Sequence, residues 1–333
     1  MTEPDHDVLR SELERTILGS APELTAEQVA QASGVTVAQA RRLWRALGFP
    51  DAVDAVAFTE PDVRALTAIE TVRGMGLDED TIVAMARAVG STMSRLADWE
   101  VDNLTAVLSA ERTSEASSLE DRFAASTQLV SQMAPIFDEV LLYAWRRHLA
   151  VAVARAELLQ PEEETPMATV TVGFADLVNF TAVTNELDED RIGELVAVFE
   201  SRSHDVIAEH GGRIIKSLGD SVLFVSASPA GGIDIGLDII GVIGGDKRLP
   251  DVRVGVATGP AVLRMGDVFG PSVNLAARLT TVARRNRVII DQATAAEVSG
   301  QDFEVRSLPA RPLRGFGDVV PATARRTRPR HAG

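Results

Sequence analysis

Apolar residues in the first half of the chain recur every three or four positions, and strand-like alternation is scarce. The segment LTAEQVAQASGVTVAQARRLWRALGF predicts a helix, a turn and a second helix, and LDEDTIVAMARAVGSTMSRLADW predicts one or two more. Thr59 and Pro61 are typical of the beginning of a helix. A longer amphipathic stretch covers about 118–159, and we expect Pro135 to kink or break it. The pattern therefore predicts an all-helical domain over 1–160.

The pattern changes after the segment QPEEETPM, whose prolines and glutamates predict a linker over 161–167. Beyond it, ATVTVGFADLV is strand-like and DEDRIGELVAVFESRSHDVIAEHGG is a helix that glycines end. RIIKSLG and SVLFVSA are predicted as two strands around a tight turn at Gly219 and Asp220, and VRVGVATG and AVLRMGD as a further pair. This mixture over 168–325 predicts an α+β or α/β domain, followed by a flexible tail at 326–333.

Composition indicates the cell compartment in which the protein works. Cysteine is absent, so disulfides and thiolate metal sites are excluded, and a reducing compartment is favoured. The most apolar run, VLLYAWRRHLAVAVARA, is interrupted by Arg146, Arg147 and His148, so no membrane span is predicted. The N-terminus, MTEPDHD, is acidic and does not resemble a signal peptide. We expect a cytoplasmic protein whose net charge of −15 disfavours non-specific binding to DNA or anionic membranes.

Two charges interrupt the otherwise apolar run IIKSLGDSVLF. Lys216 and Asp220 lie there, and burying either costs several kcal/mol unless it is paired or binds a ligand. Lys216 follows two isoleucines in a strand, so we expect little of it to be exposed. Asp176 ends the apolar strand of FADLVNFT, and carboxylates at a strand end and a hairpin turn suit a pair of hard cations. Taken singly, each aspartate is better explained as a turn former or a helix N-cap.

Three motifs occur in a characteristic order: FADLVNFT, then KSLGD, then GDVFGPSVNLAAR. Together they resemble the catalytic domain of the class III nucleotidyl cyclases over about 168–325. The resemblance implies an α+β fold of ferredoxin-like type, with a mixed or antiparallel sheet and flanking helices. It also implies that Asp176 and Asp220 bind two divalent ions, Mg²⁺ or Mn²⁺, with the backbone carbonyl of Leu177 as a further ligand.

The same resemblance assigns the nucleotide base to Lys216 and Asp267. A lysine can donate to a ring nitrogen of adenine, and a carboxylate can accept from its exocyclic amine. Guanylyl cyclases of the family typically carry glutamate and cysteine at these two positions, so the pair favours ATP. Asn274 and Arg278 match the residues that orient the ribose and meet the charge that develops on the α-phosphate.

The triphosphate is assigned to two further segments by resemblance. Arg314, in LRGFGD, matches a basic residue that faces the β- and γ-phosphates. The backbone N–H groups of Asn179, Phe180 and Thr181 match the turn that cradles the phosphates. The family motif reads DxxGFT, and this chain has Asn179 in the place of its glycine. Asparagine is the least costly substitute where φ is positive, so we expect the turn to be preserved.

The implied reaction is intramolecular: the ribose 3′-OH attacks the α-phosphate, pyrophosphate leaves and 3′,5′-cyclic AMP forms. In the family, one catalytic domain gives the metal-binding aspartates and its partner gives the other site residues. This chain has both sets, which implies a homodimer with two equivalent sites. The alternative is a guanylyl or weakly active cyclase-like signalling module with an N-terminal DNA- or protein-binding domain.

Two interpretations remain for the N-terminal domain. Its place resembles that of the helical regulatory domain in actinobacterial cytosolic cyclases, with the helices of about 118–159 as transmitting elements. His148 is then a candidate pH-sensing residue, although an ordinary helix-surface histidine is the more common explanation, and a small-molecule or lipid effector is an option. Residues of about 24–90 also resemble a MerR-like helix-turn-helix. DNA binding is disfavoured, because 1–160 carries 14 arginines and no lysine against 25 acidic residues, a net charge of −11.

Overall fold

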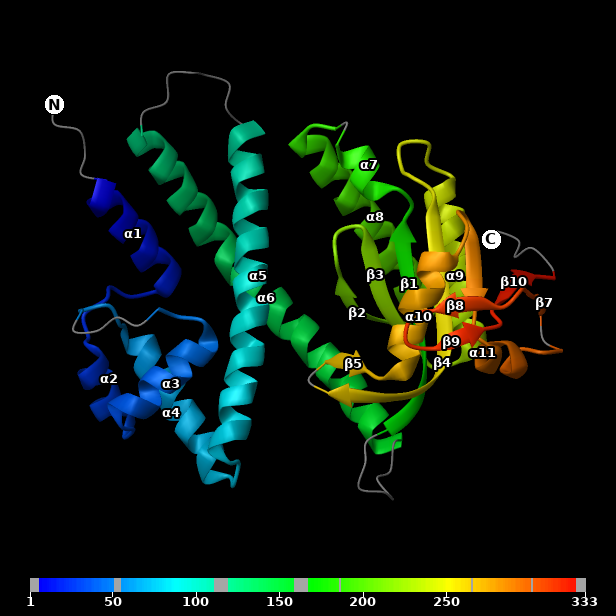
Figure 1. Ribbon diagram of the computed structural model, residues 1–333. Helices are drawn as coiled ribbons and strands as arrows, with labels where there is room; N and C mark the ends of the chain where they lie inside the picture. Colours follow the sequence, from blue (N-terminus) through cyan, green and yellow to red (C-terminus); the bar gives the residue numbers. More distant parts are fainter. Residues whose placement is uncertain are drawn as a thin grey trace. The chain divides into compact units, whose positions relative to one another are not determined.

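The computed structural model describes residues 6–50, 55–110, 119–158, 167–185, 187–264, 266–300 and 302–327. The chain divides into two compact units, Met1–Gln160 and Pro161–Gly333, which are described separately below (Figure 1). Of the predicted linker, 161–167, the first six residues lie outside the described residues. The last one, Met167, is the first residue of a strand.

The described part of the first unit is helical, as predicted. Its helices are α1 (His6–Leu18), α2 (Ala26–Ser33), α3 (Val37–Leu47), α4 (Glu60–Gly74), α5 (Glu79–Ala110) and α6 (Leu119–Leu158). The predicted helix-turn-helix is present: Thr36 caps α3, and Gly34 ends α2 in the left-handed conformation, with φ of 75°. The ring of Trp44 stacks on Phe58 at 4.2 Å between centroids, in a small core that α2, α3 and the start of α5 share.

One helix, α5, is longer than the sequence pattern suggested: it is a single helix of 32 residues. The predicted stretch of about 118–159 is confirmed as α6, which runs for 40 residues through Pro135 without ending, so of the two expected effects of Pro135 the break is wrong. Both Pro135 and Ser131, whose carbonyl loses its helical partner, are exposed, so water can satisfy that carbonyl. No helix within the described ranges is long and apolar enough to cross a membrane.

The second unit is built on a mixed sheet with the strand order β2-β3-β1-β4-β6-β10-β7, and β5 pairs with β4. The β4–β6 pairing is parallel and the other pairings are antiparallel, which confirms the predicted mixed sheet. The strands are β1 (Met167–Leu177), β2 (Arg213–Ser217), β3 (Ser221–Ser226), β4 (Val252–Arg264), β5 (Asp267–Phe269), β6 (Arg287–Ile290), β7 (Phe303–Ser307) and β10 (Ala322–Arg326). A separate hairpin joins β8 (Arg311–Leu313) to β9 (Gly317–Val319).

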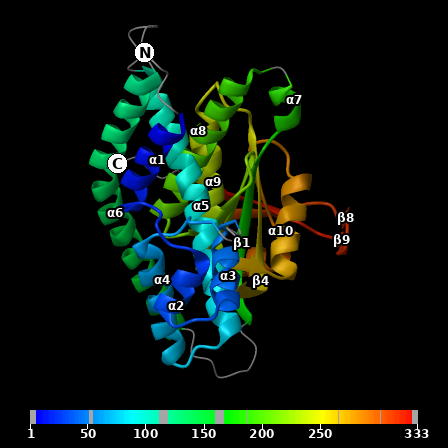
Figure 2. The same cartoon turned by 90° about the vertical axis from the view of Figure 1, so that its left-hand side faces the viewer.

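Helices cover both faces of this sheet. The helices are α7 (Phe180–Thr184), α8 (Glu189–Glu209), α9 (Pro229–Gly244), α10 (Pro271–Val282) and α11 (Gln292–Glu297). Figure 2 shows α8 and α9 on one side of the sheet and α10 on the other. One core cluster joins α8 and α9 to the sheet, and another joins α10 to it. The backbone of α10 rests directly against Gly255, where a Cβ would lie 2.4 Å from the amide nitrogen of Thr280. Only glycine permits so close an approach.

The predicted strand pair over VRVGVATG and AVLRMGD is wrong, because 252–264 forms one strand, β4. Gly259 and Pro260 resemble a turn in the sequence, yet β4 pairs with β1 from Val252 to Val262 without interruption. Proline is tolerated in a strand that has a neighbour on one side only, and the β6 pairing ends at Val256.

The end of β10 is tied to α9 by a cluster of charges. Arg326 donates from Nε to Asp234 at 2.6 Å and from Nη2 to Asp238 at 2.9 Å. The Nε2 atom of His210 also lies 2.7 Å from Oδ2 of Asp238. Only 7% of the His210 side chain is exposed. Arg326 therefore belongs to the fold and not to the predicted tail, of which 328–333 lie outside the described residues.

Replacing Arg326 with alanine is expected to lower the unfolding free energy of the second unit by about 3 kcal/mol, since two carboxylates lose charged hydrogen bonds. Scanning calorimetry measures this, and Arg325→Ala, at an exposed neighbour, is the control. Burial would raise the pKa of Asp238, but hydrogen bonds from Arg326 and His210 outweigh it and hold that pKa below its ordinary value. The stabilisation is therefore present above the ordinary aspartate range and lost as pH falls through the lowered pKa. A difference that widens in acid would contradict this.

Candidate active site

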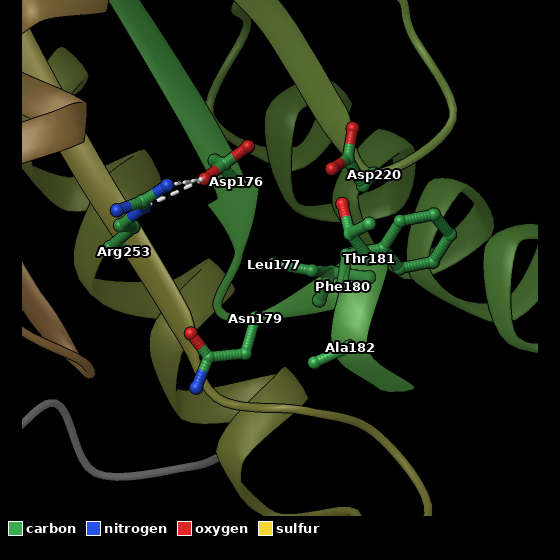
Figure 3. A pocket seen from close by; sticks show the side chains of 8 residues that line it. All are labelled: Asp176, Leu177, Asn179, Phe180, Thr181, Ala182, Asp220 and Arg253. Atoms are coloured by element: carbon green, nitrogen blue, oxygen red, sulfur yellow. Dashed lines mark hydrogen bonds and ion pairs between the residues drawn. The ribbon is translucent and has the colours of Figure 1, made fainter. Parts of the chain in front are cut away.

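A pocket of about 350 Å³ opens where β1 ends and α7 begins, beside the β2–β3 turn and the start of β4. Figure 3 shows the side chains that line it: Asp176, Leu177, Asn179, Phe180, Thr181, Ala182, Asp220 and Arg253. Six of the eight come from the single segment 176–182, which corresponds to the motif FADLVNFT and the residue after it.

Strand pairing brings the two aspartates into this pocket. Asp176 lies opposite Ser221 in the β1–β3 register, and the N–H of Leu177 donates to the carbonyl of Asp220 at 2.9 Å. Gly219, with φ of 76°, forms the turn that carries Asp220. Burial, and then the neighbouring Asp176 carboxylate, raise the pKa of Asp220. A bound cation would offset this effect on Asp220, so the place beside the two carboxylates favours a positive ion.

Arg253 is a pocket residue that sequence reasoning missed. It lies opposite Asp176 in the β1–β4 register, and its Nε and Nη2 atoms both lie 2.7 Å from Oδ2 of that carboxylate. In Figure 3 the second oxygen of Asp176 points away from Arg253, toward the side where Asp220 lies. The available signal was one arginine in the apolar run VRVGV, but its meaning depends on a register that sequence does not reveal.

The donor set suits a metal that shares its ligands with a substrate. No group of three or more histidine, aspartate and glutamate side chains gathers as a metal site within the described ranges. Asp176 and Asp220 supply the carboxylate oxygens of this pocket, and Leu177 also lines it, so side chains alone would leave a bound ion with positions to fill. Mg²⁺ is often bound by one or two carboxylates, with waters and substrate phosphates at its other positions.

Asn179 has the backbone conformation expected where the family has glycine, with φ of 59° and ψ of 28°. Its carbonyl accepts from the N–H groups of Ala182 and Val183, and this begins α7. The first N–H groups of a helix, here those of Phe180 and Thr181, have no partner in the helical ladder. The segment can therefore present donors at the pocket without a glycine.

Replacing Asn179 with alanine is expected to lower the unfolding free energy by about 1 kcal/mol, because alanine disfavours the left-handed conformation. Asn179→Gly is the matched control and should stay within about 0.5 kcal/mol of the wild type, since glycine adopts this conformation freely. Calorimetry of both variants measures the difference. Equal stability of the two would mean that the left-handed backbone is not what this position requires.

Lys216 and Asp267 meet in an ion pair, with 2.8 Å between Nζ and Oδ2. Their side chains are 40% and 30% exposed, so the expectation that little of Lys216 is exposed is wrong. The cause is that β2 is an edge strand, whose register with β3 shifts between Ile214 and Lys216. Burial would raise the pKa of Asp267, but the hydrogen bonds from Lys216 and from the N–H of Val268 lower it.

The remaining predicted residues do not line the pocket. Asn274 and Arg278 are exposed on α10, on the side away from the buried Ala276 and Thr280. Arg314 is exposed in the turn between β8 and β9. The structure thus forms the aspartate pair and the Lys216–Asp267 pair within one chain, but it does not join them in one pocket.

Comparison with known proteins decides the family. Residues 162–321 match the adenylate and guanylate cyclase catalytic domain, and residues 5–149 match the adenylate cyclase regulatory domain. An adenylate cyclase of Streptomyces coelicolor is 39% identical over 297 residues, which cover 89% of this chain and 77% of the relative. The chain belongs to the adenylate cyclase family.

Other adenylate cyclases match over similar lengths. That of Glutamicibacter nicotianae is 34% identical, covering 93% of this chain and 80% of its own length. The pH-sensitive adenylate cyclase of Mycobacterium tuberculosis is 30% identical, covering 89% and 76%. Among solved structures, the adenylyl cyclase CyaB of P. aeruginosa is 20% identical with a TM-score of 0.46, covering 51% of this chain and 100% of that one.

Proposed function

We propose that this cyclase converts ATP to 3′,5′-cyclic AMP and pyrophosphate at two equivalent sites, each shared by two copies of the chain. The observation that carries the substrate assignment is the Lys216–Asp267 pair. Lys216 can only donate hydrogen bonds and ionised Asp267 can only accept them. Adenine presents a ring acceptor beside an amine donor, so it can take one bond from each residue. Guanine presents the opposite polarity at that edge.

Asp176, Asp220 and the carbonyl of Leu177 would hold two divalent ions, for which we propose Mg²⁺ or Mn²⁺. When bound, such ions lower the pKa of the attacking 3′-OH and neutralise charge on the phosphates. Arg253 binds the Asp176 carboxylate in the free protein, and its guanidinium would lie beside the phosphates of a bound nucleotide. The N–H groups of Asn179, Phe180 and Thr181 would donate to the triphosphate, as the first turn of a helix does to anions.

The transition-state residues support a dimer. Asn274 and Arg278 point away from their own sheet, so they would act on ATP held by the partner, with Arg314 beside its outer phosphates. Arg278 would stabilise charge that develops on the α-phosphate, where an aligned cation is worth most. Each chain would then give its aspartates to one site and its base-binding pair to the other.

The N-terminal unit matches a regulatory domain, and we propose that pH or a hydrophobic ligand is its input. The similarity to a pH-sensitive relative supports pH. His148, exposed on α6, stays a candidate sensor. DNA binding gains no support, and guanylyl cyclase activity remains the second candidate because the matched family includes both activities.

The deciding experiment is an assay of the purified full-length chain with ATP and with GTP, with Mg²⁺ or Mn²⁺, across pH 5.5 to 8. Cyclic AMP from ATP is the expected product, and little cyclic GMP is expected from GTP. Absence of any cyclic nucleotide under all conditions would overturn the proposal, and preference for GTP would support the second candidate.

A further inference from the structure

Two asparagines adopt an unusual backbone. Within the described ranges, the non-glycine residues with positive φ are Asn179, at 59°, and Asn286, at 56°. Asn179 begins the helix at the pocket, whereas Asn286 lies just before β6 and lines no part of the pocket. Left-handed residues other than glycine are uncommon and often mark functional positions, so a connection between these two is informative.

Asp251 connects them. Its carbonyl accepts from the N–H of Val178, the residue before Asn179, at 2.7 Å. Its Oδ1 atom accepts from Nδ2 of Asn286 at 2.6 Å, and Nη1 of Arg285 lies 3.5 Å from Oδ2. The side chain of Asp251 is thus held by residues that lie just before β6. Its backbone carbonyl holds Val178, the residue before the turn at 179–181 to which the triphosphate is assigned.

Asn286 also holds the residue after Asp251. Its Oδ1 atom accepts from the N–H of Val252 at 3.3 Å, and its own N–H donates to the carbonyl of Val252 at 2.7 Å. The orientation of the amide follows from chemistry, because the Asp251 carboxylate can only accept and the Val252 N–H can only donate. Both ends of the Asn286 side chain are therefore used.

The segment held in this way touches the pocket loop twice. Asp251 binds the backbone of Val178, and Arg253 binds the carboxylate of Asp176, so the two contacts lie on either side of Leu177. The start of β4 therefore holds the loop that carries the proposed metal-binding and phosphate-binding groups. Asn286, just before β6, fixes the position of that part of β4.

We propose that Asn286 is a positioning residue for the triphosphate loop, acting through Asp251. This inference rests on the proposed function, because the loop matters for catalysis only if it binds the nucleotide. A left-handed backbone alone would be served at lower cost by glycine. What asparagine adds at residue 286 is an amide that reaches Asp251 and Val252 together, and this is the property that the experiment removes.

The matched variant is Asn286→Gly, which keeps the backbone conformation and deletes the amide. In the full-length chain we expect KM for ATP to rise about fivefold, as for the loss of one net hydrogen bond. The preference for ATP over GTP should stay unchanged, because the Lys216–Asp267 pair is not touched. Arg284→Ala, at an exposed residue of the same turn, is the control and should match the wild type.

A rescue variant separates positioning from simple stabilisation. Asn286→Asp alone sets two carboxylates against each other and should raise KM further. Combining it with Asp251→Asn restores a donor and an acceptor with their roles exchanged, and KM should return toward the wild-type value. Calorimetry on the same variants reports whether KM follows the contact or only the loss of stability.

The outcomes are distinct. If the wild-type chain makes no cyclic nucleotide, the proposed function fails. If the wild type is active, but Asn286→Gly lowers the melting temperature without changing KM, or the double variant is no better than Asn286→Asp, the positioning role is wrong. A raised KM at unchanged nucleotide preference, reversed in the double variant, supports it.

Discussion

Mixing two inactive variants, Asp176→Ala and Arg278→Ala, is expected to restore about one quarter of the wild-type activity. Alone, each forms homodimers in which both sites lack one essential group, and each should lose at least about 10²- to 10³-fold in kcat. In a heterodimer, one site receives both defects and the other receives none. Random exchange makes half of the dimers heterodimers, and half of the sites in these are intact. Cyclic AMP production by an equimolar mixture measures the effect.

The control is a mixture of Asp176→Ala with Asp220→Ala. Both aspartates line the same pocket, so each site of that heterodimer keeps one defect and no activity should return. Differently tagged chains, purified through both tags, establish that heterodimers have formed. Inactive heterodimers of the first pair would show that the aspartates and Arg278 serve the same site of one chain, and the shared-site proposal would then be abandoned.

Exchanging the base-binding pair is expected to change the substrate. The double variant Lys216→Glu with Asp267→Cys should lose about 10³-fold or more in kcat/KM for ATP, since sites built around hydrogen bonds strongly reject a ligand of the wrong polarity. A glutamate can accept from the ring N–H and amine of guanine, so kcat/KM for GTP should rise. Steady-state kinetics with each nucleotide measure the ratio.

The activity with GTP shows whether the variant still folds and binds metal, because Asp176, Asp220 and Arg253 are unchanged. Asp267→Asn supplies a milder comparison, in which the acceptor becomes a group that can also donate, and the preference for ATP should weaken without reversing. Retained ATP preference in an active double variant would mean that Lys216 and Asp267 do not contact the base.

Local sequence patterns predicted the helices and the motif residues, because these depend on near neighbours. Apolar spacing located α2 to α4, and the order of the motifs identified Asp176 and Asp220 before any pairing was known. Sequence alone could not decide whether Pro135 would break α6, because the exposure of Ser131 and Pro135 decides whether the lost hydrogen bond matters.

Contacts that depend on strand register could not be foreseen. Arg253 lies 77 residues after Asp176, and only the β1–β4 pairing sets them opposite each other. The contact of Asp251 with Asn286 likewise requires the parallel β4–β6 pairing that follows it. Aspartate and arginine are common where a strand begins, and asparagine is common in a turn. The local sequence therefore does not distinguish Asp251, Arg253 or Asn286.

The ion pair between Lys216 and Asp267 has an evolutionary consequence. With the base held by Lys216 and Asp267 as proposed, a lineage that changes nucleotide one substitution at a time would pass through a protein in which one of these charges has lost its neighbour and the base-binding pair suits neither base. The fitness of each mutation thus depends on the other. The two positions are expected to change together, as a coupled pair, whenever a cyclase built this way moves between ATP and GTP.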